Sequence, residues 1–146
     1  MLQSVPCTNH QSIPPNLPTI LLVEDEPFVR EATRNILEDA GFRVLAAENA
    51  AEAMRVYESC HRSIDLVVTD MVLQGRCGHD LGRDIRQLSP QVSVLVTSGY
   101  GNAEYETEDP AIRTYFLAKP YSRRELLGKI ETILDQAAQC AGAQAS

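Results

Sequence analysis

Five short apolar runs alternate with amphipathic stretches along the chain, and this alternation restricts the fold more than any other feature of the sequence. The runs suit buried strands and cover Thr19–Val23, Arg43–Ala47, Ile64–Thr69, Val92–Thr97 and Tyr115–Ala118. Strands that alternate with helices form right-handed βαβ units. The sequence therefore predicts an α/β domain whose parallel sheet is covered by helices on both faces.

The stretches between these runs carry helix signals. Pro27 suits a first helical turn, and Gly41 ends the first helix. A second helix is expected from Ala50 to about Cys60, and a third through Leu81 and Leu88. In the last helix, Ser122 and Glu125 form a capping box. The region from Gly99 to Ile112 is acidic and contains glycine and proline, so a helix there is poorly supported.

The ends of the chain differ from its centre. Residues 1–18 are polar and hold four prolines, which predicts a flexible leader. Residues 19–139 form the expected domain. Residues 140–146 are small and polar, and we expect them to fray.

Charge and composition limit the classes of partner. The net charge is −7, which argues against binding nucleic acid or an anionic membrane through bulk charge. No apolar stretch approaches the roughly 20 residues that a membrane span needs. No secretory signal is recognisable at the N-terminus, so a cytoplasmic location is predicted. The four cysteines contain no CxxC spacing, which disfavours structural zinc and favours free thiols.

Acidic residues follow two of the apolar runs. Glu24 and Asp25 come directly after the first, and Asp70 closes the third. A carboxylate at the end of a buried strand is costly unless a charged group lies beside it. If the two strands are neighbours, the three acids converge at one edge of the sheet. Oxygen-rich clusters of this kind suit Mg²⁺.

Two more strand ends carry polar groups. Ser98 follows the fourth run, and Lys119 follows the fifth. An aspartate can attack phosphorus and form an acyl phosphate. A cation, a lysine and a hydroxyl around Asp70 would supply the positioning and charge neutralisation that such chemistry needs.

Together these motifs resemble the receiver domain of two-component response regulators, and are similar to receivers attached to hybrid histidine kinases. The resemblance rests on Val23–Pro27, Asp70, Thr97–Tyr100 and Lys119-Pro120, in this order along the chain. It implies a flavodoxin-like, doubly wound five-stranded parallel sheet with strand order 2-1-3-4-5 and about five helices.

The resemblance also implies roles for individual residues. Asp70 would be the phosphoacceptor, and Mg²⁺ would be held by Asp25, Asp70, the backbone carbonyl of Val72 and, through water, Glu24. Ser98 takes the place of the switch hydroxyl, Lys119 would bind the phosphoryl group, and Phe116 matches the aromatic residue that reports activation.

The chain departs from the family pattern after the phosphoacceptor. Gln74 stands where a proline is usual, whereas the expected glycine is present as Gly78. Val72 and Tyr100 occupy positions that influence how water reaches the acyl phosphate in this family. Because both could shield Asp70, we predict slow self-dephosphorylation.

The implied partners are a histidine kinase or a histidine phosphotransfer protein, together with a downstream protein target. We expect no output domain within this chain, so it would be either a stand-alone regulator or an excised receiver of a hybrid kinase. An alternative is a receiver-like module that binds its partner without phosphorylation. A phosphohydrolase is a third possibility, but Val72 stands where a second acid would be needed.

Overall fold

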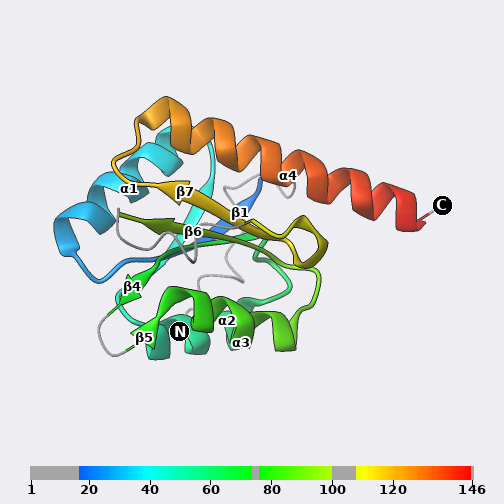
Figure 1. The fold of residues 1–146 in the computed structure, drawn as a ribbon, viewed down its shortest axis with the longest axis horizontal. Helices are drawn as coiled ribbons and strands as arrows, with labels where there is room; N and C mark the ends of the chain where they lie inside the picture. Colours follow the sequence, from blue (N-terminus) through cyan, green and yellow to red (C-terminus); the bar gives the residue numbers. More distant parts are fainter. Residues whose placement is uncertain (1–16, 74–75, 100–107, 146) are drawn as a thin grey trace, which may run out of the picture.

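The computed structural model describes residues 17–73, 76–99 and 108–145. Five parallel strands form one sheet in the order β2-β1-β3-β6-β7 (Figure 1). They cover, in that order, Arg43–Ala47, Thr19–Val23, Leu66–Asp70, Ser93–Ser98 and Thr114–Ala118. This is the predicted order 2-1-3-4-5, and each predicted strand lies within two residues of an observed one.

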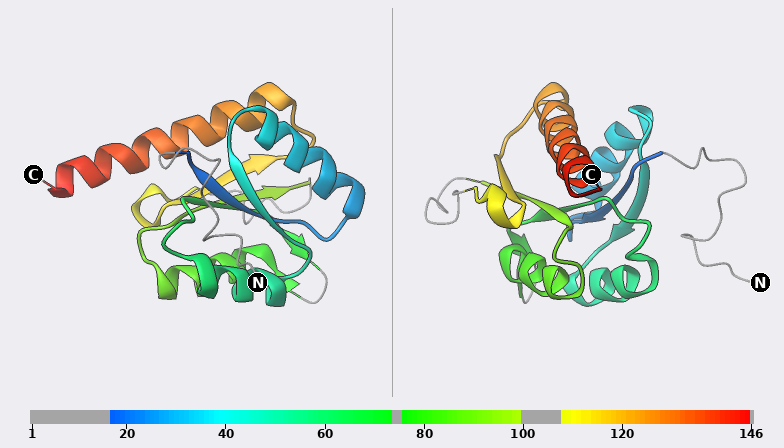
Figure 2. Two further views of the ribbon diagram at one scale, coloured as in Figure 1. Left: turned by 180° about the vertical axis from the view of Figure 1, so that it is seen from behind. Right: turned by 90° about the vertical axis from the view of Figure 1, so that its right-hand side faces the viewer.

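Helices cover both faces of the sheet, as predicted. The helices are α1 (Pro27–Asp39), α2 (Ala50–Cys60), α3 (Gly78–Leu88) and α4 (Arg123–Ala145). Figures 1 and 2 show α2 and α3 on one face and α1 and α4 on the other. Each face has its own buried apolar cluster, one around Tyr57 and Leu81 and the other around Leu37 and Ile130.

The capping signals act as the sequence predicts. The Ser122 hydroxyl accepts a hydrogen bond from the Glu125 backbone N–H, and the Glu125 carboxylate accepts one from the Ser122 N–H. Pro27 occupies the first turn of α1, where its missing N–H costs nothing. These contacts fix where α1 and α4 leave the sheet.

The helix count is lower than predicted. The described residues contain four α-helices, against about five expected. Between β6 and β7 they show only a short 3-10 helix, Pro110–Ile112, and residues 100–107 lie outside the described part. An acidic segment with glycine and proline has little intrinsic preference for a helix.

Two further features were not predicted. A two-stranded hairpin, β4 (Val72–Leu73) with β5 (Arg76–Cys77), follows β3 directly. The prediction of free thiols holds for Cys77 but is wrong for Cys60, which is disulfide-bonded. Cys7 lies outside the described residues.

The division into leader, domain and tail stays a prediction, because residues 1–16 are not described. At the other end, α4 continues as a helix to Ala145. Among the described residues, no helix has both the length and the apolar character needed to span a membrane.

Candidate functional site

Three carboxylates meet at one end of the sheet because β1 and β3 are adjacent. Val23 of β1 is in register with Thr69 of β3, so Glu24 and Asp25 emerge beside Asp70. One oxygen from each of these three acids lies within 4.8 Å of the others. Only 5% of Glu24 is exposed, while Asp25 and Asp70 are partly buried. The predicted acidic cluster is therefore present.

Lys119 brings a positive charge to this cluster. Its Nζ lies 3.3 Å from Oδ1 of Asp70 and 3.6 Å from Oε1 of Glu24. Burial alone would lower the pKa of Lys119, but the charges of Asp70 and Glu24 outweigh it and raise that pKa. The ammonium group is thus held charged beside Asp70.

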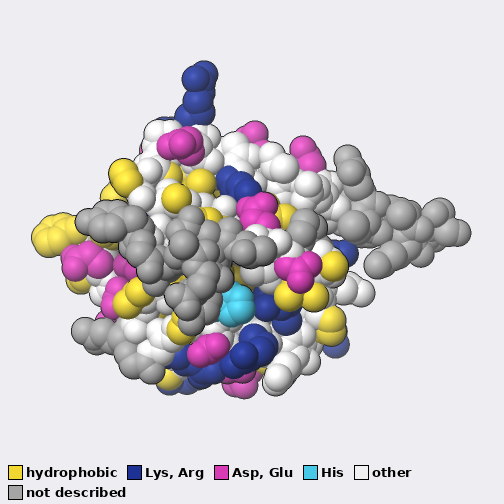
Figure 3. Space-filling view, viewed as in Figure 1, with side chains coloured by type: hydrophobic (Ala, Val, Ile, Leu, Met, Phe, Trp, Pro, Cys, Tyr) yellow, Lys and Arg dark blue, Asp and Glu magenta, His cyan; other side chains and the backbone are white. Residues whose placement is uncertain are grey.

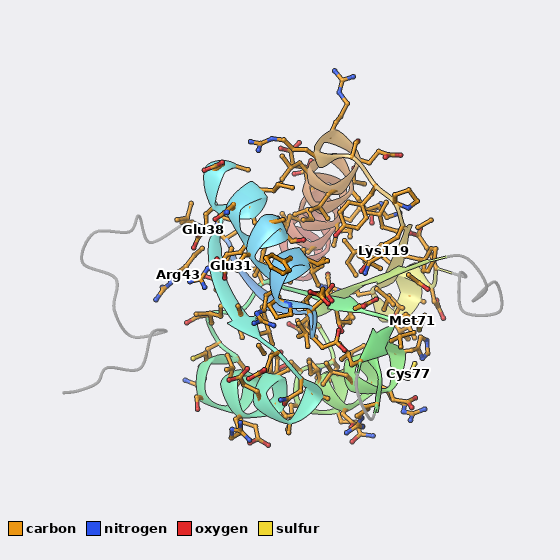
Figure 4. The ribbon with its side chains drawn as sticks, turned by 90° about the vertical axis from the view of Figure 1, so that its left-hand side faces the viewer. Glu31, Glu38, Arg43, Met71, Cys77 and Lys119 are labelled. Atoms are coloured by element: carbon orange, nitrogen blue, oxygen red, sulfur yellow. The ribbon has the colours of Figure 1, made fainter. Side chains whose placement is uncertain are left out.

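Backbone contacts fix the position of Lys119. Its N–H donates to the carbonyl of Ser98 over 2.7 Å, which continues the pairing of β7 with β6. The peptide bond to Pro120 is cis. Figure 4 looks onto this end of the molecule and shows Lys119 on the same side as Met71 and Cys77.

Two contacts hold Glu24 in place. Its Oε2 accepts a hydrogen bond from the Glu26 N–H, and its backbone carbonyl accepts one from Arg30 Nη1 over 2.8 Å. Arg30 was not predicted as part of the site. It lies one turn into α1, so helical spacing could have indicated that it faces back toward the acids.

The backbone next to Asp70 is held on two sides. The Met71 N–H donates to the Thr97 carbonyl over 2.7 Å, and the Met71 carbonyl accepts from the Gly78 N–H over 2.6 Å. A Cβ atom on Gly78 would lie 1.9 Å from the Asp70 carbonyl oxygen, so this position requires glycine. The hairpin therefore returns the chain tightly against Asp70.

The structure describes three of the four remaining predicted residues, Ser98, Phe116 and Val72. Ser98 is buried at the end of β6, and its hydroxyl donates to the Gly99 carbonyl. Phe116 lies on β7, where its N–H donates to the Glu108 carboxylate. Val72 begins the hairpin and is 64% exposed. Tyr100 lies outside the described residues.

A groove of about 530 Å³ borders the site on the side of α1. Phe28, Ile36, Tyr121 and Lys119 are among the residues that line it. Phe28 is 85% exposed, more than any other large apolar side chain among the described residues. Figure 3 shows hydrophobic side chains gathered at the end of the molecule where α1 begins.

Burial of Glu24 leads to a prediction about pH. Burial raises its pKa above 4.5, although the Glu26 N–H and Lys119 act in the opposite direction. The folded protein therefore keeps a proton that the unfolded chain has lost, so this group makes stability fall as pH rises from 4.5 through the folded pKa. Glu24→Gln, which stays neutral, should gain stability relative to wild type across this window. Urea unfolding in magnesium-free buffer at several pH values tests this, and a constant difference contradicts it.

Comparisons with known proteins agree with this geometry. The family model described as "Response regulator receiver domain" matches residues 20–131. The chain is 32% identical over 119 residues to the sensor kinase CckA of Brucella abortus. This match covers 81% of this chain and 13% of that protein. The chain also spans about half the length of two transcriptional regulatory proteins that it matches.

Solved structures show the same fold. A response regulator receiver domain protein from Clostridium thermocellum has a TM-score of 0.77 and 26% identity, over 85% of this chain and 99% of that one. The receiver domain of the hybrid histidine kinase CckA has a TM-score of 0.68 and 29% identity, over 80% of this chain and 98% of that one. With its matching strand order and acidic cluster, the chain belongs to the response regulator receiver domain family.

Proposed function

We propose that Asp70 accepts a phosphoryl group from a phosphohistidine, with Mg²⁺ as cofactor, and that the modified domain then changes its partner binding. The observation that carries this proposal is the position of Lys119, 3.3 Å from Asp70 within a cluster of three acids. A carboxylate attacking phosphorus needs positive charge beside it to offset the charge of the phosphoryl oxygens. The chain modifies only itself in this reaction.

The acid cluster suits a hard divalent cation. Its donors are all carboxylate oxygens, and burial raises the pKa of Glu24. Asp25, Asp70 and the carbonyl of Val72 would hold Mg²⁺ directly, with Glu24 acting through water. When bound, the ion would supply charge neutralisation for the phosphoryl oxygens.

The reaction exchanges one bond for another. A carboxylate oxygen of Asp70 attacks phosphorus, an oxygen–phosphorus bond forms, and the bond from phosphorus to the donor's imidazole nitrogen breaks. The nitrogen keeps the electron pair. Lys119 pairs with the new charge, and the Ser98 hydroxyl exchanges its bond to the Gly99 carbonyl for one to a phosphoryl oxygen.

The switch would involve the end of the sheet formed by β6 and β7. The Ser98 carbonyl accepts a hydrogen bond from the Lys119 N–H, which directly follows β7. Phe116 lies on β7 itself. A rearrangement of Ser98 can therefore shift the equilibrium between two arrangements of this surface, with Phe116 as its reporter. A downstream protein target would read that surface.

The groove beside α1 suits the donor protein. It reaches Lys119, and its exposed Phe28 offers an apolar anchor next to the acids. A histidine kinase or histidine phosphotransfer protein would dock there and bring its phosphohistidine to Asp70. A cytoplasmic location, and no direct contact with nucleic acid or membrane, stay predictions that accompany this proposal.

Acetyl phosphate with Mg²⁺ provides the direct test. Intact mass should show one phosphoryl adduct on the wild type and none on Asp70→Asn, while the exposed α4 variant Asp135→Asn behaves as wild type. The phosphate mimic beryllofluoride should likewise bind only when Asp70 is present. A chain that takes neither reagent would be a phosphorylation-independent interaction module, and turnover of free phosphate esters would indicate a hydrolase.

Val72 leads to a prediction about the lifetime of the adduct. It is an exposed apolar residue two positions after Asp70, where it can keep water from the acyl phosphate. We expect slow self-dephosphorylation in the wild type and roughly tenfold faster loss in Val72→Asn, which corresponds to about 1.4 kcal/mol in the barrier. Decay of the adduct after removal of acetyl phosphate measures both rates. A wild-type lifetime of seconds would contradict the prediction.

A further inference from the structure

A second cavity, of about 540 Å³, lies at the other end of the sheet from the acids. Pro18, Ile64, Val92 and Arg113 line it, and each of these residues lies one or two positions before a strand. The cavity is therefore at the amino ends of the strands, whereas Asp70 lies at a carboxyl end. The proposed phosphoryl chemistry does not use it.

Helices from both faces of the sheet border this cavity. Tyr57 of α2 and His61, which follows that helix, line it from one side. The helix α4 covers the opposite face, but it runs past the amino ends of the strands, and its Leu134 and Ala137 also line the cavity (Figure 1). Small-molecule sites have volumes of roughly 300–1,000 Å³. The cavity is therefore large enough for a small organic molecule.

The hydroxyl of Tyr57 indicates that the cavity has a polar occupant. Tyr57 is fully buried, and its hydroxyl has no hydrogen-bond partner among the described residues. Burial raises the pKa of this hydroxyl, and the nearby Ser89 acts in the opposite direction. Because Ser89 also lines the cavity, the hydroxyl end of the ring lies at the cavity wall. A buried hydroxyl without a partner is costly, so an acceptor placed in the cavity would be favourable.

Positive charge at the cavity indicates which kind of acceptor fits. Two arginines, Arg62 and Arg113, line it together with one described acid, Asp65. The carboxylate of Asp65 is already engaged, because its Oδ2 accepts a hydrogen bond from the Thr19 N–H over 2.8 Å. A guanidinium group offers five N–H donors in a planar fork that matches a carboxylate. The arginines therefore favour an anionic acceptor.

The two kinds of donor lie on the same side of the cavity. The Tyr57 hydroxyl is near Ser89, while Nη1 of Arg113 donates to the Gln91 carbonyl over 2.8 Å. Ser89 and Gln91 belong to one tight turn, which is closed by a hydrogen bond from the Val92 N–H to the Ser89 carbonyl over 3.0 Å. A single carboxylate can therefore meet both donors.

We propose that this cavity binds a small organic carboxylate with an apolar body. The carboxylate accepts a hydrogen bond from the Tyr57 hydroxyl and pairs with Arg113, while the apolar body packs against Val92 and Leu134. An inorganic anion would leave the apolar part of the wall unfilled. An uncharged hydrocarbon would leave the hydroxyl unpaired. The amphipathic anion satisfies both parts of the wall.

Calorimetric titration with 3-phenylpropionate tests this proposal. The probe joins a carboxylate to an apolar ring, and 3-phenylpropionamide has nearly the same shape without the charge. The wild type should bind one propionate per chain and should bind the amide roughly tenfold more weakly. Octanoate, which has an aliphatic body, serves as a second acid. Equal affinity for the propionate and its amide, or no binding of either acid at millimolar concentration, would overturn the proposal.

Tyr57→Phe tests the unpaired hydroxyl. Without ligand, this variant should unfold at a higher temperature than the wild type, because a buried hydroxyl without a partner is removed. Its affinity for 3-phenylpropionate should fall roughly fivefold, because the ligand loses a hydrogen bond. A lower unfolding temperature would show that the hydroxyl already has a partner, and wild-type affinity would show that it does not contact the ligand. Either result contradicts the proposal.

Arg113→Met tests the charged anchor, with Arg55→Met as the matched control on an exposed part of α2. Arg113→Met should bind 3-phenylpropionate roughly tenfold more weakly and the amide as the wild type does, because only the ion pair is lost. Arg55→Met should bind both probes normally. An equal loss of affinity for both probes in Arg113→Met, or no loss at all, would sink the proposal. Adduct formation with acetyl phosphate is a separate readout, and both variants should match the wild type in it.

Discussion

Alanine in place of Gly78 is expected to lower the free energy of unfolding by about 3 kcal/mol and to abolish phosphorylation of Asp70. The added Cβ would lie 1.9 Å from the Asp70 carbonyl oxygen and 2.9 Å from its carbonyl carbon. These are backbone atoms, so no side-chain rotation can relieve the contact. The hairpin, Asp70 or both must move, and the carboxylate then loses its position beside Lys119.

Gly128 provides the control for this prediction. A Cβ there would meet nothing within 4 Å, and the residue lies inside α4. Gly128→Ala should therefore raise the free energy of unfolding by roughly 0.5–1 kcal/mol and leave phosphorylation unchanged. Urea unfolding and adduct formation with acetyl phosphate measure both variants. If Gly78→Ala matches the wild type in both measurements, the close contact between Gly78 and the Asp70 carbonyl is contradicted.

Methionine in place of Lys119 should have the second large effect. It leaves the buried Glu24 and the partly buried Asp70 without their nearby positive charge, at a cost of about 2 kcal/mol. Phosphorylation should fall at least a hundredfold, because charge neutralisation at Asp70 is lost. Mg²⁺ should stabilise this variant more than the wild type, since a cation then replaces the missing ammonium group.

Lys129 is the matched lysine for comparison. It pairs with Glu108, whose side chain is 35% exposed, against 6% for Glu24 and 14% for Asp70. Lys129→Met should cost no more than about 1 kcal/mol, with an ordinary phosphorylation rate and no extra stabilisation by Mg²⁺. Thermal unfolding with and without Mg²⁺ compares the variants. Equal responses of Lys119→Met and Lys129→Met would show that Lys119 has no special role.

Most of the fold could be predicted because its signals are local. A buried parallel strand reads as an apolar run, and the capping box of Ser122 and Glu125 marks one helix start directly. The clustering of Glu24 with Asp70 required one more step, the assumption that their strands are neighbours. The structure confirms this assumption, because β1 pairs with β3.

The features that could not be predicted depend on contacts between distant or weakly patterned segments. The two-residue strands of the β4–β5 hairpin are too short to show alternation. Helical spacing could have indicated that Arg30 faces the acids, but its contact with the Glu24 carbonyl also depends on the angle at which α1 leaves β1. The disulfide of Cys60 could not be assigned from cysteine spacing alone.

The α1 groove adjoins the acids but does not include them, and this has a consequence for how signalling pathways stay insulated from one another. The residues proposed to carry the chemistry all belong to this chain, so any donor need only present phosphorus on a good leaving group. Discrimination among donors must then depend on the exposed surface around Phe28. This surface adjoins Lys119 but contributes no group to the proposed reaction. Substitutions there could redirect the chain to another kinase while its chemistry stays the same.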